Sequence, residues 1–291
     1  MPSFTAISAL AIEIFSRRSA RRKTEPDLVM DDPEKVAAFT RAGRVDGVMA
    51  PMYLFHCAQI SEVIRPGDTV LDLGCGPATQ LSLVASINPQ SNFIGVDLSP
   101  EMLAKAANYI EEQAVGNIEL RQEDITRLAS FPDQSVDAVM STVVLHHLPD
   151  VDALQSVFAE VARVLKPGGG IYIVDFGHLK SERSIQKFAY QYADRQPELF
   201  TLDYLYSLQA AFWLEDFKNA HERHLQAYSN IYSTFIAPFL VAIKSPARHS
   251  HDLELAGKIK ALKQALPSHH KTDIEDLKTF FSLGKLKSPY L

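Results

Sequence analysis

The sequence predicts an α/β protein with a doubly wound, mostly parallel sheet, and three observations support this. A short strand-like segment at residues 70–73 ends in Gly74 and Gly76, and a helical pattern follows. Strand, glycine turn and helix form the first half of a nucleotide-binding α/β unit. Further strand-like segments then alternate with helical patterns up to residue 176. Polar residues follow several of these strands, at the sheet edge where ligands of such folds bind.

The elements can be placed in order along the chain. Helices are expected before the first strand, starting at Pro33 behind the candidate cap Asp32 and broken near residues 47–51. Ser99 and Pro100 begin another helix, and a long one precedes the glycine-rich stop at residues 167–170. The strands are expected at residues 70–73, 92–97, 118–122, 136–141 and 170–176, with an antiparallel edge pair at 224–230 and 235–243.

The domain organisation follows from the same patterns. Residues 1–30 form an amphipathic, basic N-terminal segment, and residues 31–246 form the α/β domain. The aromatic, helical stretch 180–222 is longer than a plain crossover needs, so it is expected to be a lid beside the sheet. Residues 247–291 are expected to be a polar C-terminal tail with one or two short helices.

Composition limits which classes of binding partner and which cellular compartment are expected. A net charge of −6 over 291 residues gives no footprint for nucleic acid. Two cysteines, Cys57 and Cys75, indicate a reducing, cytoplasmic compartment and are too few for a cysteine-built zinc site, so no metal is predicted. No apolar run approaches the ~20 residues of a membrane span.

The N-terminal segment leaves two interpretations open. Residues 4–23 are either a docked helix with a solvated basic end or a peripheral helix on an anionic membrane surface. The oligomeric state is left open by the sequence.

Acids at three successive strand ends indicate a nucleoside pocket. Asp97 lies 21 residues after Gly76, a distance at which an acid can accept both ribose hydroxyls. Asp72 lies in the first strand, and Asp124 follows the third, where it can accept from an adenine amine. The pocket is not expected to take NAD, because the dinucleotide fingerprint needs a third glycine where the chain has Thr79.

Six motifs follow one another between residues 70 and 169. They are Val70-Leu71-Asp72-Leu73-Gly74-Cys75-Gly76, Gly95-Val96-Asp97-Leu98-Ser99-Pro100-Glu101-Met102-Leu103, Asp124-Ile125, Phe131-Pro132-Asp133-Gln134-Ser135-Val136-Asp137-Ala138-Val139, Leu145-His146-His147-Leu148 and Val164-Leu165-Lys166-Pro167-Gly168-Gly169. In this order they resemble the class I S-adenosylmethionine-dependent methyltransferases, a Rossmann-like fold with a seven-stranded sheet. Within that family the sequence is similar to the branch with the ubiquinone- and menaquinone-type enzymes. One departure is Ala78, where the family usually has its third glycine.

The resemblance implies S-adenosylmethionine as cofactor and a small-molecule methyl acceptor. It implies that the glycine turn approaches the methionine part of the cofactor, with Asp72 at its amino group and Asp97 at the ribose. The implied cofactor residues are Asp72, Gly74, Cys75, Gly76, Asp97, Leu98, Met102, Asp124, Ile125 and Ser141.

The acceptor side is less clear from the sequence. His146 and His147 follow the fourth strand, and each is either a base or substrate contact or a part of the framework. The aromatic lid suggests a small apolar or aromatic metabolite as acceptor, with Tyr53, His56, Tyr204 and Trp213 as further candidate contacts. The alternatives are a cofactor-binding partner protein without catalysis and a methyltransferase with a macromolecular acceptor.

Overall fold

A seven-stranded sheet organises the chain in a computed structural model, which describes residues 4–44 and 47–291. The strand order is β3-β2-β1-β4-β5-β7-β6, and only β7 runs antiparallel to its neighbours. The predicted doubly wound fold is therefore confirmed. The strands are β1 (Thr69–Leu73), β2 (Asn92–Asp97), β3 (Ile118–Gln122), β4 (Val136–Thr142), β5 (Leu165–Phe176), β6 (Asn230–Ser233) and β7 (Leu240–Lys244).

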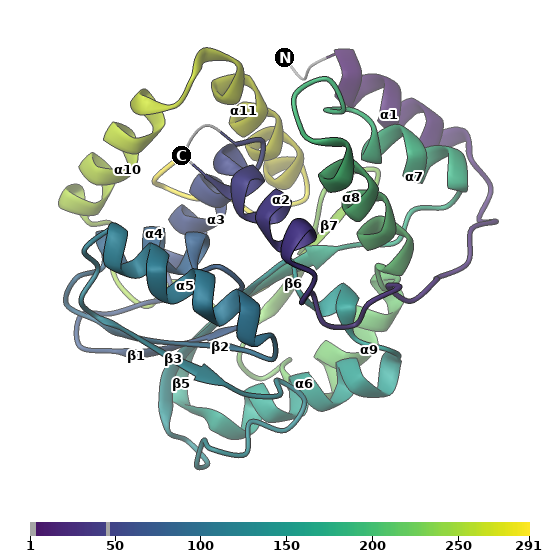
Figure 1. The fold of residues 1–291 in the computed structure, drawn as a ribbon. Coiled ribbons are helices and arrows are strands. Elements are labelled where there is room, and N and C mark those ends of the chain that lie inside the picture. Colours follow the sequence, from purple (N-terminus) through teal and green to yellow (C-terminus); the bar gives the residue numbers. More distant parts are fainter. Residues whose placement is uncertain (1–3, 45–46) are drawn as a thin grey trace.

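Helices cover both faces of the sheet (Figure 1). On one face lie α6 (Val151–Val164) and α9 (Leu214–His224), which bury Phe158 and Phe217 against β4 and β5. The other face carries α3 (Ala50–Ser61), α4 (Thr79–Ile87), α5 (Pro100–Glu112), α10 (Leu253–Ala265) and α11 (Ser268–Leu283). The two faces hold separate apolar cores, as expected for parallel strands that are buried on both sides.

A helical cap lies over the carboxyl ends of the strands. It consists of α1 (Phe4–Phe15), α2 (Pro33–Gly43), α7 (Glu182–Ala189) and α8 (Glu198–Ala210). In the cap, α8 contacts α2, α7 and the short 3₁₀ turn η1 (Leu145–His147) that follows β4. The cap therefore meets the sheet edge at which ligands of this fold class bind.

Two sequence expectations need correction in detail. The edge strands lie at β6 and β7, because residues 224–229 finish α9 and the turn after it. The lid is shorter than 180–222, because α9 packs beside α6 on a face of the sheet.

The one or two short helices expected after residue 247 are present as α10 and α11. Both pack on α3, and α11 buries Ile274 and Phe281.

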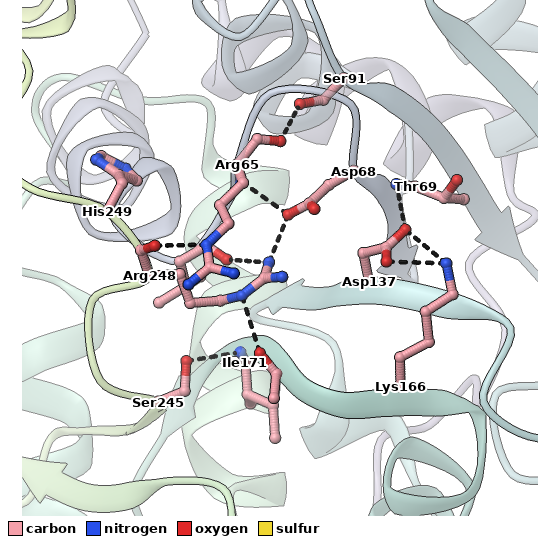
Figure 2. A network of polar contacts seen from close by, with 12 residues as sticks. Arg65, Asp68, Thr69, Ser91, Asp137, Lys166, Ile171, Ser245, Arg248 and His249 are labelled. Carbon is pink, nitrogen blue, oxygen red and sulfur yellow. Dashed lines mark hydrogen bonds and ion pairs between the residues drawn. The ribbon is translucent and has the colours of Figure 1, made fainter.

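A polar network lies at the amino ends of the strands, away from the ligand-binding edge (Figure 2). The Lys166 ammonium donates to both oxygens of Asp137 at 2.8 and 2.9 Å, and Asp137 also accepts from the Thr69 amide at 3.0 Å. Arg248 pairs with Asp68 and donates to the Gly168 carbonyl. These contacts join the amino ends of β1, β4 and β5 to the segment after β7, so the strands are held firmly beneath the ligand-binding edge.

The basic N-terminal segment is largely engaged within the protein. The Arg18 guanidinium lies over the Trp213 ring, and Arg22 lies over Phe212. Lys23 pairs with Glu182 at 3.0 Å. Residues 16–31, which we call the strap, thus cross the cap from α1 toward α2. Within the described part of the chain, no helix is long and apolar enough to cross a membrane.

Candidate cofactor and acceptor site

The main cavity has a volume of about 570 Å³ and opens at the carboxyl ends of β1, β2 and β4. Its size suits a cofactor or drug-sized ligand. The sheet, the strap and the cap all contribute to its wall. Seven of the residues that the sequence implied for cofactor binding line it: Gly74, Gly76, Asp97, Leu98, Met102, Asp124 and Ile125.

The glycine turn requires both of its glycines, for different reasons. Gly74 has φ +68°, and a Cβ atom there would lie 2.3 Å from a methyl carbon of Val144. Gly76 has φ +52°, and its nearest neighbour would be Phe39 at 3.9 Å, so space on that side is left for a ligand. Ala78 also takes a left-handed conformation, with φ 56°, which explains why glycine is usual at this position.

Gly74→Ala is expected to lower the free energy of unfolding by about 1–3 kcal/mol, because left-handed backbone and a steric overlap with Val144 add together. Chemical denaturation would measure it. Gly116→Ala is a matched control, since a Cβ atom at Gly116 meets nothing within 4 Å and its φ is not left-handed. Equal stability of the two variants would contradict the strain at Gly74.

Asp97 closes β2 and fixes the glycine turn. Its carboxylate accepts from the Gly76 amide and from the Ser99 amide, both at 2.9 Å. Burial raises the pKa of Asp97, while these amide donors favour its charged form. Asp124 closes β3 and accepts from the amide and hydroxyl of Thr126 at 2.8 and 2.7 Å. Both carboxylates line the cavity, so both can also meet a ligand.

Three implied cofactor residues lie behind the cavity wall instead. Asp72, Cys75 and Ser141 are buried and do not line the cavity. The Ser141 hydroxyl donates to the Leu73 carbonyl at 2.9 Å, which joins β4 to β1. Burial, with the nearby Asp97 charge, raises the pKa of Asp72 to about 8.

The strap closes one side of the cavity, and sequence analysis did not find it. Leu28, Val29 and Met30 line the cavity. Arg22 fixes the strap by donating to the carbonyls of Ala210 and Pro149, both at 2.7 Å, and to those of His146 and Leu148. The sequence signal for the strap was weak, since a run of arginines usually indicates a solvated surface.

His146 is held by a buried carboxylate where η1 meets α8 at the cavity wall. Its Nδ1 atom lies 2.8 Å from Asp175 of β5, which also accepts from the amides of Leu145, His146 and Phe176. Because a carboxylate only accepts, Nδ1 carries the proton and the lone pair of the neutral ring is on Nε2. Burial alone would lower the pKa of His146, but Asp175, with Glu25 and Asp203 beyond it, raises it overall.

His147 and two acids surround His146. Burial, followed by the neighbouring His146, lowers the pKa of His147 to about 3, so its ring is neutral. Glu25 of the strap lies with one carboxylate oxygen 4.0 Å from the Nε2 atom of His146, and burial raises its pKa. Asp203 of α8 lines the cavity, and burial raises its pKa to about 6.

The structure places the four candidate substrate contacts in different environments. Tyr204 lines the main cavity, as expected. The other three do not line it. His56 is buried in the core with its Nδ1 atom 2.7 Å from the Tyr172 hydroxyl, and Tyr53 points its hydroxyl at the Met49 sulfur. Trp213 stacks on His178 at 4.2 Å and carries Arg18 on its ring. Its apolar surface is used to anchor the strap.

A smaller apolar cavity of about 110 Å³ continues from the main one. The two cavities share the side chains of Met49, Phe176, Phe200 and Tyr204. Val48, Met52 and Phe239 complete the apolar wall of the smaller cavity. A ligand that enters the main cavity can therefore extend an apolar group between α3 and the cap.

Comparisons with known proteins agree with this fold. Residues 70–169 match the family described as "Methyltransferase domain". The arsenite methyltransferase of Halobacterium salinarum is 40% identical over 113 residues, which cover 38% of this chain and 28% of that protein. The demethylmenaquinone methyltransferase of Lactobacillus johnsonii is 36% identical over 114 residues, covering 38% of this chain and 45% of that protein.

A solved structure supports the fold over a longer range. The plantazolicin methyltransferase BpumL, in complex with SAH, matches with a TM-score of 0.55 at 16% identity and covers 91% of this chain and 92% of its own. The chain spans less than two thirds of the length of the curated relatives it matches first.

The fold and the matched segment together define a class. The chain carries a class I methyltransferase domain, whose cofactor is S-adenosylmethionine. The resemblance drawn from the sequence motifs is thereby confirmed, and so is S-adenosylmethionine as the cofactor.

Proposed function

We propose that the whole protein is an S-adenosylmethionine-dependent methyltransferase whose acceptor is a small apolar or aromatic metabolite. The observation that carries this is the shared cavity, in which the glycine turn and two acids occupy one end and the aromatic cap the other. The cofactor supplies a methyl group on a sulfonium, a leaving group that is already activated. The protein's own task is then mainly to align the acceptor and exclude water.

At the cofactor end, we assign the ribose to Asp97 and the adenine to Leu98, Met102, Asp124 and Ile125. The support is that all five line the cavity next to the glycine turn. Leu98 and Met102 follow β2 on either side of the Ser99 cap, which places apolar surface beside the carboxylate.

Asp97→Ala is expected to weaken binding of the cofactor by about 1–3 kcal/mol, because it leaves a bound polar group without its partner. Calorimetric titration with S-adenosylhomocysteine would measure this. Asp152→Ala is the matched control, since it removes another carboxylate that lines the same cavity and that we do not assign to the cofactor. Wild-type affinity in Asp97→Ala would rule out the ribose role.

At the acceptor end, Phe176, Phe200 and Tyr204 form the wall between the two cavities. Aromatic and apolar walls of this kind favour ligands with planar or apolar surface. His146 and His147 line the same cavity. We propose that His146, whose ring Asp175 holds through Nδ1, acts on the acceptor's reacting group and that His147 is a contact beside it.

Tyr204→Ala is expected to raise the KM for the acceptor by about 10-fold or more, because it enlarges the pocket and removes aromatic contact area. The affinity for S-adenosylhomocysteine should stay within about 2-fold. Tyr228→Ala serves as the control, since Tyr228 lies by the opposite edge of the sheet. If Tyr204→Ala instead lost cofactor affinity, the cap would cover a different ligand from the one proposed.

The names of the relatives do not identify the acceptor, because one is an arsenite methyltransferase and another a demethylmenaquinone methyltransferase. Arsenite is disfavoured, since the chain has only two cysteines and a three-thiolate site needs a third. Both are free and buried, as suits the reducing, cytoplasmic compartment that the composition predicts.

The test is an incubation with methyl-labelled S-adenosylmethionine and a low-molecular-weight metabolite extract. Formation of S-adenosylhomocysteine together with a labelled product of low mass is the expected result. Tight cofactor binding without turnover would favour a non-catalytic partner protein, and label that enters only protein or nucleic acid would favour a macromolecular acceptor.

A further inference from the structure

We propose that Glu25, His146 and His147 form a binding site for a divalent first-row transition metal ion at the acceptor end of the main cavity. The sequence alone predicts no metal site. Glu25 belongs to the strap and the two histidines to η1, and only the fold brings them together.

The spacing of the three side chains suits one ion. Each offers a ligand atom, and these atoms all lie within 4.8 Å of one another. Metal–ligand bonds of about 2.0–2.2 Å place ligand atoms roughly 3–4 Å apart around an ion. The Nε2 atom of His146 and the nearer oxygen of Glu25 are 4.0 Å apart, within that range and too far for a hydrogen bond. The site therefore needs only a small inward movement to hold an ion.

Two atoms of the cluster are left without a partner. One carboxylate oxygen of Glu25 and the Nδ1 atom of His147 are buried, and neither has a hydrogen-bond partner among the described residues. Glu25 is 6% exposed, so water gives it little compensation. Leaving buried polar atoms unpaired is costly, and one bound cation would stabilise the cluster without any other change in the fold.

The surroundings provide the outer contacts that ligating side chains need. The Nδ1 atom of His146 is held by Asp175 at 2.8 Å, which fixes the ring with Nε2 toward Glu25. Such carboxylate–histidine pairs orient histidine ligands and increase their basicity. On the other side, the Ser207 hydroxyl is a hydrogen-bonding neighbour of the Glu25 carboxylate. Ser207 and Asp175 come from α8 and β5, the elements that frame the cavity.

The strap is fastened to the loop that carries the histidines. Arg22 lies three residues before Glu25 and donates to the carbonyls of His146, Leu148 and Pro149. The position of Glu25 is therefore set relative to η1 and not by a loose terminus.

One side of the cluster faces the cavity. His146, His147 and the nearby Asp203 all line it. Two imidazoles and one carboxylate, with open positions on the cavity side, suit ions such as Fe²⁺, Mn²⁺ or Zn²⁺. An oxygen of the acceptor could complete the coordination, and the ion would lower the pKa of an acceptor hydroxyl bound to it. His146 would then serve as a ligand and not as a proton acceptor.

The test is direct titration of the chelator-treated, full-length protein with Zn²⁺, with Mn²⁺ and, without oxygen, with Fe²⁺, followed by calorimetry. We expect one ion per chain for at least one of these metals. Glu25→Gln and His147→Ala should each weaken binding by about 100-fold or more, since even outer-shell changes cost 10–100-fold. His269→Ala removes an exposed histidine of α11 and should leave the affinity unchanged.

Co²⁺ adds a spectroscopic reading, because its visible absorption depends on the coordinating atoms. The bands should appear in the wild-type protein and be lost in Glu25→Gln, a substitution that keeps the shape of the side chain. The proposal is overturned if none of the ions binds, or if binding is the same in Glu25→Gln and His147→Ala as in the wild type. The titration needs neither cofactor nor turnover, so its failure and the failure of the proposed methyltransferase activity are separately visible.

Discussion

His146→Ala is expected to lower the turnover number by about 10²–10⁴-fold, the range found when a group that acts on the reacting atoms is removed. The reason is that His146 lines the cavity and that Asp175 holds its ring through Nδ1, which leaves Nε2 as the ring's acceptor atom. Turnover with labelled S-adenosylmethionine, at saturating cofactor, is the measurement. The prediction holds whether the ring takes a proton or binds an ion.

The affinity of the His146→Ala variant for the cofactor product is the control for this result. Binding of S-adenosylhomocysteine by His146→Ala should stay within a few-fold of wild type, because the glycine turn and Asp97 lie at the other end of the cavity. Circular dichroism would check the fold. Turnover within a few-fold of wild type would make the histidine a part of the framework and shift attention to the cap.

Asp175→Ala is expected to lower the free energy of unfolding by about 3–5 kcal/mol, the usual cost of breaking a buried charged pair. Asp175 is fully buried and accepts from the His146 ring and from the amides of Leu145, His146 and Phe176. Alanine leaves all of these donors unpaired. Urea denaturation followed by fluorescence would measure the loss.

Asp175→Asn is the informative counterpart. Its amide oxygen can replace one of the two accepting carboxylate oxygens, so part of the stability should return. The negative charge beside His146 is lost, however, and the raised pKa of His146 should fall. Equal stability of Asp175→Ala and the wild type would mean that Asp175 is not the anchor of η1.

Much of the sheet could be predicted from the sequence, because its signals are local. The segment ending at Gly74 and the one ending at Asp97 carry their own turn and cap residues, and the structure places β1 and β2 there. The predicted bounds of the two edge strands were wrong, because the Leu240–Lys244 strand and its short partner are not flanked by such turn and cap residues. Short helices were expected after residue 247, but their packing on α3 could not be predicted, because it depends on residues far away in the sequence.

Seven of the residues implied for cofactor binding line one cavity, and the sequence could place them together because they lie at or just after strand ends. The acceptor end could not be predicted, because it is assembled from distant segments. Glu25, Asp203 and Phe176 meet only after the strap and α8 fold over η1. Of the residues at this end, only Asp175 could have been singled out from the sequence, because an acid in the otherwise apolar end of a strand indicates a buried polar partner.

The central claim is that the cavity at the strand ends binds S-adenosylmethionine and its demethylated product. Calorimetric titration of the full chain with S-adenosylhomocysteine, and separately with NAD, tests it most directly. The account predicts one molecule of S-adenosylhomocysteine per chain, binding that is weakened in Asp97→Ala, and no heat from NAD. Tight binding of NAD with none of S-adenosylhomocysteine would contradict it.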